Sequence, residues 1–101
     1  MGRADRLIHA ARRLSERAAS LRFAAPVTHV YDPLRHAGRG YRRYVRRFGE
    51  GRKRVVFLGM NPGPWGMTQT GVPFDGSARV LVRRTSTRAD PSKASPARAA
   101  R

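Results

Sequence analysis

The sequence contains no cysteine, few acidic residues and no long apolar run, and each of these absences excludes a class of function. Without cysteine, the chain cannot form a disulfide framework, a thiolate metal site or a cysteine nucleophile. No apolar run approaches the roughly 18 residues of a membrane-spanning helix, and the N-terminus lacks the apolar core of a secretory signal. The sequence therefore predicts a cytosolic, monomeric protein with no membrane partner.

The residues that could carry acid–base or metal chemistry are scarce and scattered. Only six acidic residues occur, they form no visible acid–base pair, and Asp32 is expected to cap the Asp-Pro turn in which it lies. The three histidines share no metal-ligand spacing, so surface or packing roles are expected for His9, His29 and His36. We therefore predict no metal site.

What the chain has in excess is positive charge. Lysine and arginine total 22 of 101 residues against 6 acids, which gives a net charge of +16 spread along the chain. Such a field favours a polyanionic partner, because neutralising phosphates releases counterions, and nucleic acid is the leading candidate. A plainer explanation stays open, since arginine-rich and alanine-rich composition also arises from GC-rich coding and from solvated helix faces.

Two stretches have the periodicity of amphipathic helices. Apolar residues recur at spacings of four, three, four and three over residues 5–24, which predicts a helix that Pro26 stops. In "GYRRYVRRFGEG" the apolar side chains recur at i, i+3, i+4 and i+7, and Gly49 is placed to end the helix. The other face of this second helix is either an ordinary solvated face or a surface that contacts DNA phosphates through Arg42, Arg43, Arg46 and Arg47.

Two further stretches favour extended backbone. "VTHVYDP" predicts a brief strand or an extended linker, and the apolar run 55–58 in "KRVVFLG" predicts a buried strand of a parallel sheet. A helix followed by such a strand indicates an α/β protein, in which ligands bind at the carboxyl ends of the strands. From about residue 84 the sequence has too little apolar surface to offset the entropy of ordering, so we expect disorder there.

The loop that follows residues 55–58 has an unusual composition. Pro62 and Pro64 stiffen it, while Gly63 lets its backbone approach a bulky ligand closely. Asn61 offers an amide that can hold a water or bind the edge of a heterocycle, and Phe74 follows a proline on a segment suited to stacking on a base. Each residue also has an ordinary explanation, with Asn61 as a turn residue and Phe74 as core.

The run "FLGMNPGPWGMTQTGVPF" resembles the first motif of the single-strand-selective monofunctional uracil-DNA glycosylases, and "VYDPLRHAGRGYRRYVRRFG" is similar to the segment that precedes it. The resemblance covers roughly residues 25–74. It implies an α/β/α sandwich around a four-stranded parallel sheet, and a base-excision repair enzyme without metal or cofactor, whose partner is DNA containing uracil or a damaged pyrimidine. By motif position, it implies that Asn61 positions the attacking water, that Met60 and Gly63 shape the pocket wall, and that Phe74 stacks on the flipped base.

After Phe74 the chain departs from this family. The family implies an asparagine on a later strand and a loop like His-Pro-Ser-Pro-Arg, but residues 75–101 contain neither asparagine nor histidine. We therefore expect a partial glycosylase-like domain at 1–76 and a disordered, low-complexity basic tail at 77–101. The tail would result from a shift of the reading frame near Phe74–Asp75, and the truncated protein would have impaired activity. The alternative is a small basic nucleic-acid-binding protein without enzymatic activity.

Overall fold

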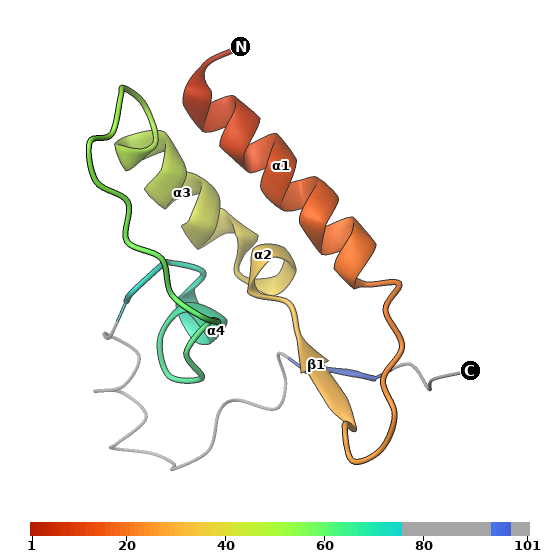
Figure 1. Cartoon of the computed structure of the whole chain (residues 1–101). Coiled ribbons are helices and arrows are strands. Elements are labelled where there is room, and N and C mark those ends of the chain that lie inside the picture. Colours follow the sequence, from red (N-terminus) through yellow and green to blue (C-terminus); the bar gives the residue numbers. More distant parts are fainter. Residues whose placement is uncertain (76–93, 98–101) are drawn as a thin grey trace.

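The computed structural model describes residues 1–75 and 94–97, which form helices and one small sheet (Figure 1). The elements in chain order are α1 (Arg3–Ala18), β1 (His29–Tyr31), α2 (Pro33–His36), α3 (Gly38–Phe48), α4 (Met67–Thr70) and β2 (Ala94–Pro96). None of the helices in this part of the chain is long and apolar enough to cross a membrane.

Helix α1 begins where an acidic residue from elsewhere in the sequence satisfies its first backbone donors. The amides of Arg3 and Ala4 donate to the carboxylate of Glu50, with N···O distances of 3.2 and 3.0 Å. A negative charge at this end is also favourable for the helix dipole. Because Glu50 follows α3, this contact makes α1 and α3 neighbours that run in opposite directions (Figure 1).

Helix α1 ends at Ala18, so the predicted helix over residues 5–24 is too long. The hydroxyl of Ser20 donates to the carbonyl of Arg17 at 2.7 Å, a local bond that competes with continuation of the helix. Leu21, the last member of the predicted stripe, is exposed. Leu7 and Leu14, two stripe residues inside the helix, are exposed as well, so apolar spacing alone reports neither the burial of the stripe nor the end of the helix.

The second predicted helix is confirmed as α3, which ends at Phe48 with Gly49 as its C-terminal cap. Its residue Val45 is buried and, with Ala4 of α1, forms the buried apolar core of the described residues. Tyr44 is half-buried, but Phe48 is exposed and contacts the Tyr44 ring at a centroid distance of 5.3 Å. The core is therefore small.

The sheet contains two short antiparallel strands. The predicted brief strand in "VTHVYDP" is confirmed as β1, which pairs with β2 in the register His29↔Pro96, Val30↔Ser95 and Tyr31↔Ala94. The disorder predicted from residue 84 lies mostly outside the described residues, and it is wrong for 94–96, where β2 forms. The described fold is thus mixed α and β, and the parallel sandwich that the resemblance implies stays a prediction.

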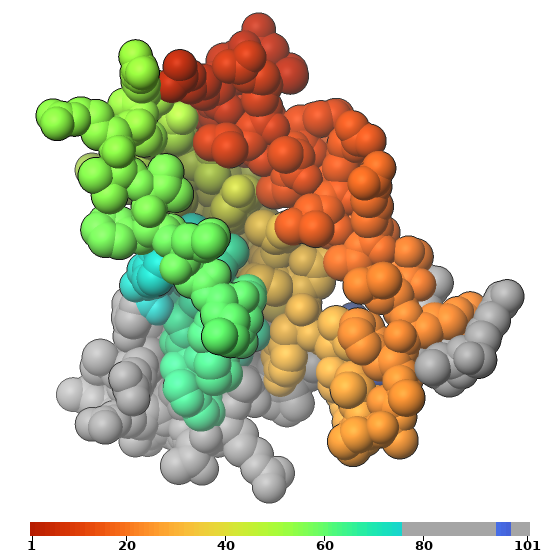
Figure 2. Space-filling model, in the orientation of Figure 1, coloured from red at the N-terminus to blue at the C-terminus, as the bar shows by residue number. Residues whose placement is uncertain are grey.

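The buried strand predicted at residues 55–58 is wrong, because these residues belong to no strand and their side chains are exposed. Leu58 is 94% exposed. An apolar run becomes a buried strand only when neighbouring strands pair with it and helices cover it, and the described part of the chain supplies neither. Figure 2 shows the green segment that contains this run lying on the surface of the molecule.

Helix α4 is held against α2, and this contact positions the loop before it. The ring of His36, at the end of α2, hydrogen-bonds through Nε2 to the carbonyl of Thr68 at 2.6 Å. Gly71 ends α4 with φ +75°, and a Cβ there would lie 2.3 Å from the carbonyl oxygen of Ala37. Only glycine fits this left-handed, crowded position.

Asp32 lies at the N-terminal cap position of α2, but its side chain does not cap that helix. Its carboxylate instead accepts a hydrogen bond from the hydroxyl of Ser15 on α1. The predicted capping role is therefore wrong for this side chain, which links α1 to the segment that leads into α2.

Candidate functional site

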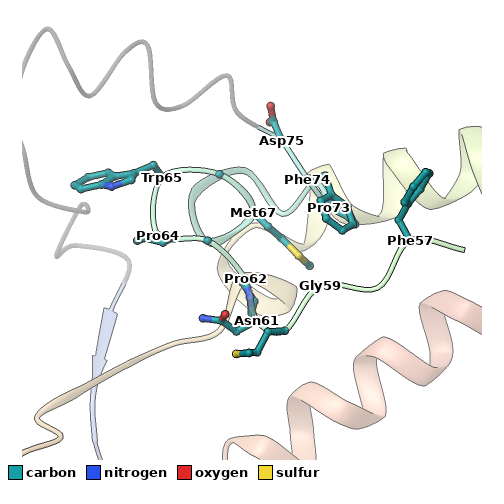
Figure 3. Close-up of a pocket in the computed structure, with 13 residues that line it drawn as sticks. Phe57, Gly59, Asn61, Pro62, Pro64, Trp65, Met67, Pro73, Phe74 and Asp75 are labelled. Atoms are coloured by element: carbon teal, nitrogen blue, oxygen red, sulfur yellow. The ribbon is translucent and has the colours of Figure 1, made fainter.

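Two segments that are separate in sequence enclose a cavity of about 650 Å³ (Figure 3). One is the loop that follows the apolar run 55–58, and the other is the short segment after α4. The residues that line the cavity are Phe57, Gly59, Met60, Asn61, Pro62, Gly63, Pro64, Trp65, Gly66, Met67, Pro73, Phe74 and Asp75. Its volume falls within the range of about 300–1,000 Å³ typical of small-molecule sites.

The loop keeps its shape because α4 anchors its carbonyl groups. The backbone amide of Thr68 donates to the carbonyl of Gly63 at 3.1 Å, and the side-chain amide of Gln69 donates to the carbonyl of Pro64 at 3.1 Å. Both donor residues, Thr68 and Gln69, are buried, so these bonds are shielded from water. The loop is thereby fixed at its α4 end, while Asn61 lies at its exposed end.

The opposite wall of the cavity holds Phe74 in an unusual conformation. Its φ is +57°, which is rare for a bulky residue, and its side chain is 73% exposed. The Phe74 ring meets the Phe57 ring edge to face at 6.5 Å and stands in van der Waals contact range of the Cβ position at Gly59. Strained backbone of this kind is concentrated at functional sites, where the surrounding structure maintains it.

A close backbone contact joins the two walls. A Cβ at Gly66 would lie 2.0 Å from the carbonyl oxygen of Asp75, so the loop and the segment that carries Phe74 touch at this glycine. The distance between the walls therefore depends on a residue without a side chain.

The structure brings together the pocket residues named from the sequence. Asn61, Met60, Gly63 and Phe74 all line this cavity, and their individual roles stay predictions. In Figure 3 the Met67 side chain reaches between the loop at Asn61 and the Phe74 ring.

The four arginines named as DNA contacts lie elsewhere. All are exposed on α3, and none lines the cavity: Arg42, Arg43, Arg46 and Arg47.

Sequence reasoning missed several lining residues, of which Met67, Trp65 and Asp75 carry the most chemistry. Met67 and Trp65 belong to the same motif, but nothing in their spacing distinguishes a cavity wall from core. Asp75 follows Phe74 directly, and its backbone carbonyl lies beside Gly66. Among the described residues, no group of three or more His, Cys, Asp or Glu side chains is arranged to hold a metal ion.

Taken together, the cavity combines one carboxamide, the exposed rings of Phe57 and Phe74, and a stiff backbone floor. An amide both donates and accepts, so Asn61 can hold a water molecule or the edge of a heterocycle. A ring such as that of Phe74 can stack on any planar base, because every base presents a π-face. This arrangement suits a flat polar heterocycle better than a charged or purely apolar ligand.

No family model matches the chain. Curated relatives match about two thirds of the chain. The single-strand selective monofunctional uracil-DNA glycosylase of Rattus norvegicus is 49% identical over 69 residues, which are 68% of this chain and 24% of that protein. The proteins of the same name from Mus musculus and Bos taurus are 49% identical over 69 residues and 52% identical over 62 residues. The chain thus spans about a quarter of the length of these relatives, and the resemblance to this family is confirmed for about two thirds of the chain.

Proposed function

We propose that this chain is a uracil-DNA glycosylase-like protein of base-excision repair, whose reaction is hydrolysis of the N-glycosidic bond of uracil and related damaged pyrimidines in DNA. One observation carries the proposal. Asn61 and Phe74 line one cavity, in a chain that is about half identical to a uracil-DNA glycosylase over 69 of its residues.

In this reaction Asn61 holds the attacking water. As the bond between C1′ of the sugar and the base nitrogen breaks, the base leaves with the bonding electrons and the sugar becomes oxocarbenium-like. Water then forms the new bond to C1′ and loses a proton to solvent. Because the cation is largely formed before attack, a neutral amide that orients the water suffices, and no strong base is needed.

Phe74 offsets the cost of removing the base from its stack. Extrusion costs a few kcal/mol, and stacking on an aromatic ring recovers about 1–3 kcal/mol. The exposed Phe74 ring is available for such stacking, and its restrained backbone keeps the ring in place before the base arrives. Met60 and Gly63 would line the pocket beside the base.

We further propose that the chain as printed excises uracil slowly. The resemblance implies that a second asparagine and a histidine support the leaving base, and residues 75–101 provide neither residue type. One donor that stabilises developing negative charge is worth roughly 3–4 kcal/mol in the transition state. Losing two such groups would lower the rate by several orders of magnitude.

Two measurements test the pocket. Trp65 is the single tryptophan and lines the cavity, so its fluorescence should report binding of a uracil-containing single strand. We expect Phe74→Ala to weaken this binding by about 5- to 150-fold, whereas Phe48→Ala, which removes an exposed ring outside the cavity, should leave it unchanged. Equal losses for the two variants would contradict a base pocket at Phe74.

Abasic product formed under single-turnover conditions tests the water-holding role. Asn61→Ala should lower the rate by at least about 100-fold, since an oriented catalytic donor is worth that much. An unchanged rate would contradict the assignment of Asn61.

A second candidate function is nucleic-acid binding without chemistry. It is favoured by the position of the exposed arginines of α3, none of which lines the cavity. Salt-sensitive binding in a gel-shift series, with no abasic product at any protein concentration, would support this function over the first.

A further inference from the structure

We propose that the groove between α1 and α3 binds the phosphates of a single-stranded nucleic acid through Arg12, Arg35, Arg42 and Arg46. This inference rests on the nucleic-acid-binding part of the proposed function and not on uracil excision. The groove is a separate feature of the molecule, because it shares no lining residue with the loop cavity.

Three elements bring arginines to this groove. Its volume is about 1,000 Å³, and its walls include Arg12 of α1, Arg35 of α2, and Arg42 and Arg46 of α3. Two acids, Asp5 and Glu16, also line it, so the side chains of the groove carry a net positive charge. Sequence reasoning named four arginines of α3 as DNA contacts, and only the fold places Arg12 of α1 in the same groove as two of them.

The four guanidinium groups have no protein counterion. Within residues 1–75 and 94–97, none of them makes a hydrogen bond or lies within 4.0 Å of a carboxylate. Arginine forks match phosphate oxygens in pairs, and each contact to a phosphate is a charge-assisted bond. Converging cations without partners are stabilised when an anionic ligand enters between them.

The shape of the site favours a chain of phosphates over one anion or a flat surface. Arg42 and Arg46 are one helical turn apart, about 6 Å along the axis, so they present successive charges along the groove. The groove volume of about 1,000 Å³ suits a few nucleotides of an extended single strand and is too small to admit a duplex. The concave shape also excludes close contact with a planar lipid surface.

Tyr41 adds a neutral donor to the same groove. Burial, and to a smaller extent the neighbouring Tyr44, raises the pKa of the Tyr41 phenol above its ordinary value of 10.0. The phenol therefore stays protonated at neutral pH and can donate to a phosphate or sugar oxygen.

The other two arginines of α3 provide a matched control. Arg43 and Arg47 do not line the groove, and the guanidinium carbon of Arg47 lies 5.4 Å from the centroid of the Phe48 ring. The pairs 42/46 and 43/47 share the same helix, the same spacing and the same charge.

The test compares Arg42→Ala/Arg46→Ala with Arg43→Ala/Arg47→Ala. Fluorescence anisotropy with an undamaged thymidine single strand gives the slope of log K against log[salt]. We expect the slope to become less steep by about 1.4 for the groove pair, at about 0.7 per single-strand phosphate, and by less than about 0.5 for the control pair. Equal changes for both pairs would overturn the groove as the site.

Two further measurements keep the test decisive. The variant Arg42→Lys/Arg46→Lys preserves the charge, so it should retain the wild-type salt slope, and this expectation holds even if the alanine pair perturbs folding. Loss of the salt slope in the lysine pair would overturn the proposal. Polyglutamate at equal charge concentration should compete at least tenfold less well than the single strand, and equal competition would overturn nucleic acid as the ligand. Because the strand contains no uracil, failure of the uracil pocket leaves these results unaffected.

Discussion

The contact between the two walls of the cavity predicts opposite outcomes for two glycines of one loop. A Cβ at Gly66 would lie 2.0 Å from the carbonyl oxygen of Asp75, although real Cβ contacts essentially never fall below 3.0 Å. In Gly66→Ala the two backbones must therefore move apart by about 1 Å, and overpacking of this kind costs about 1–3 kcal/mol. At Gly63 a Cβ meets nothing within 4 Å. Gly63→Ala should leave the free energy of unfolding unchanged or raise it by up to about 1 kcal/mol.

Urea unfolding followed by circular dichroism measures the free energy of unfolding of the two variants. Trp65 fluorescence with a uracil-containing single strand measures their binding. A loss of 2 kcal/mol in Gly66→Ala corresponds to a decrease in Tm of about 8–16 °C for a domain of this size. Gly63→Ala should keep its stability but weaken binding at least about fivefold, because the new methyl group enters the cavity. Equal stability of the two variants would refute the close contact between the walls.

Three further predictions concern the scaffold. Glu50→Ala should lower the free energy of unfolding by about 1–2 kcal/mol, because the first amides of α1 lose their acceptor, whereas Glu16→Ala, which removes an exposed acid of α1, should change it by less than about 0.5; similar urea midpoints would contradict the cap. Folding raises the pKa of Tyr41, so the unfolded chain ionises first, and the free energy of unfolding should be constant below about pH 10 and fall as the pH rises through the folded pKa. In thermal unfolding, Tyr41→Phe should reduce this fall. An unchanged pH profile in this variant would exclude the burial of the phenol as the cause of the fall. Leu58→Lys should change the free energy of unfolding by less than about 0.5 kcal/mol, since the side chain is exposed, and a loss above 2 kcal/mol would restore the buried strand that the sequence predicts.

Local sequence patterns located some elements of the fold and misplaced others. The i, i+3, i+4, i+7 spacing located α3, because its buried residue Val45 packs on α1 within the same small core. The same kind of spacing overextended α1, since the apolar periodicity continues to Leu21 although the helix ends at Ala18. The run that includes Leu58 has the composition of a buried strand, but a strand depends on partners that no local pattern reports.

Several residues of the cavity could be named from the sequence. The contact that brings its two walls together could not be predicted from the sequence. Composition singled out Asn61 and Phe74, because an amide and a ring beside stiff backbone are suited to a heterocycle. Their meeting depends on Gly66, which touches the segment of Phe74, and on Gly71, which ends α4 in a left-handed conformation. Glycine contacts of this kind leave no signal in periodicity or charge.

As proposed, the cavity binds the base and the arginine groove binds the phosphates, so these two tasks fall to separate surfaces. No residue lines both, and the groove arginines come from α1, α2 and α3, whereas the cavity is formed around the loop before α4. Binding to phosphates should then persist when the pocket is altered, and recognition of the base should persist when Arg42 and Arg46 are neutralised, apart from a uniform loss of affinity. A variant such as Phe74→Ala should therefore weaken binding of the base in the cavity while keeping the salt dependence of binding. Loss of both properties from this single change would mean that the strand follows one continuous path through the cavity, and that the groove is not its site.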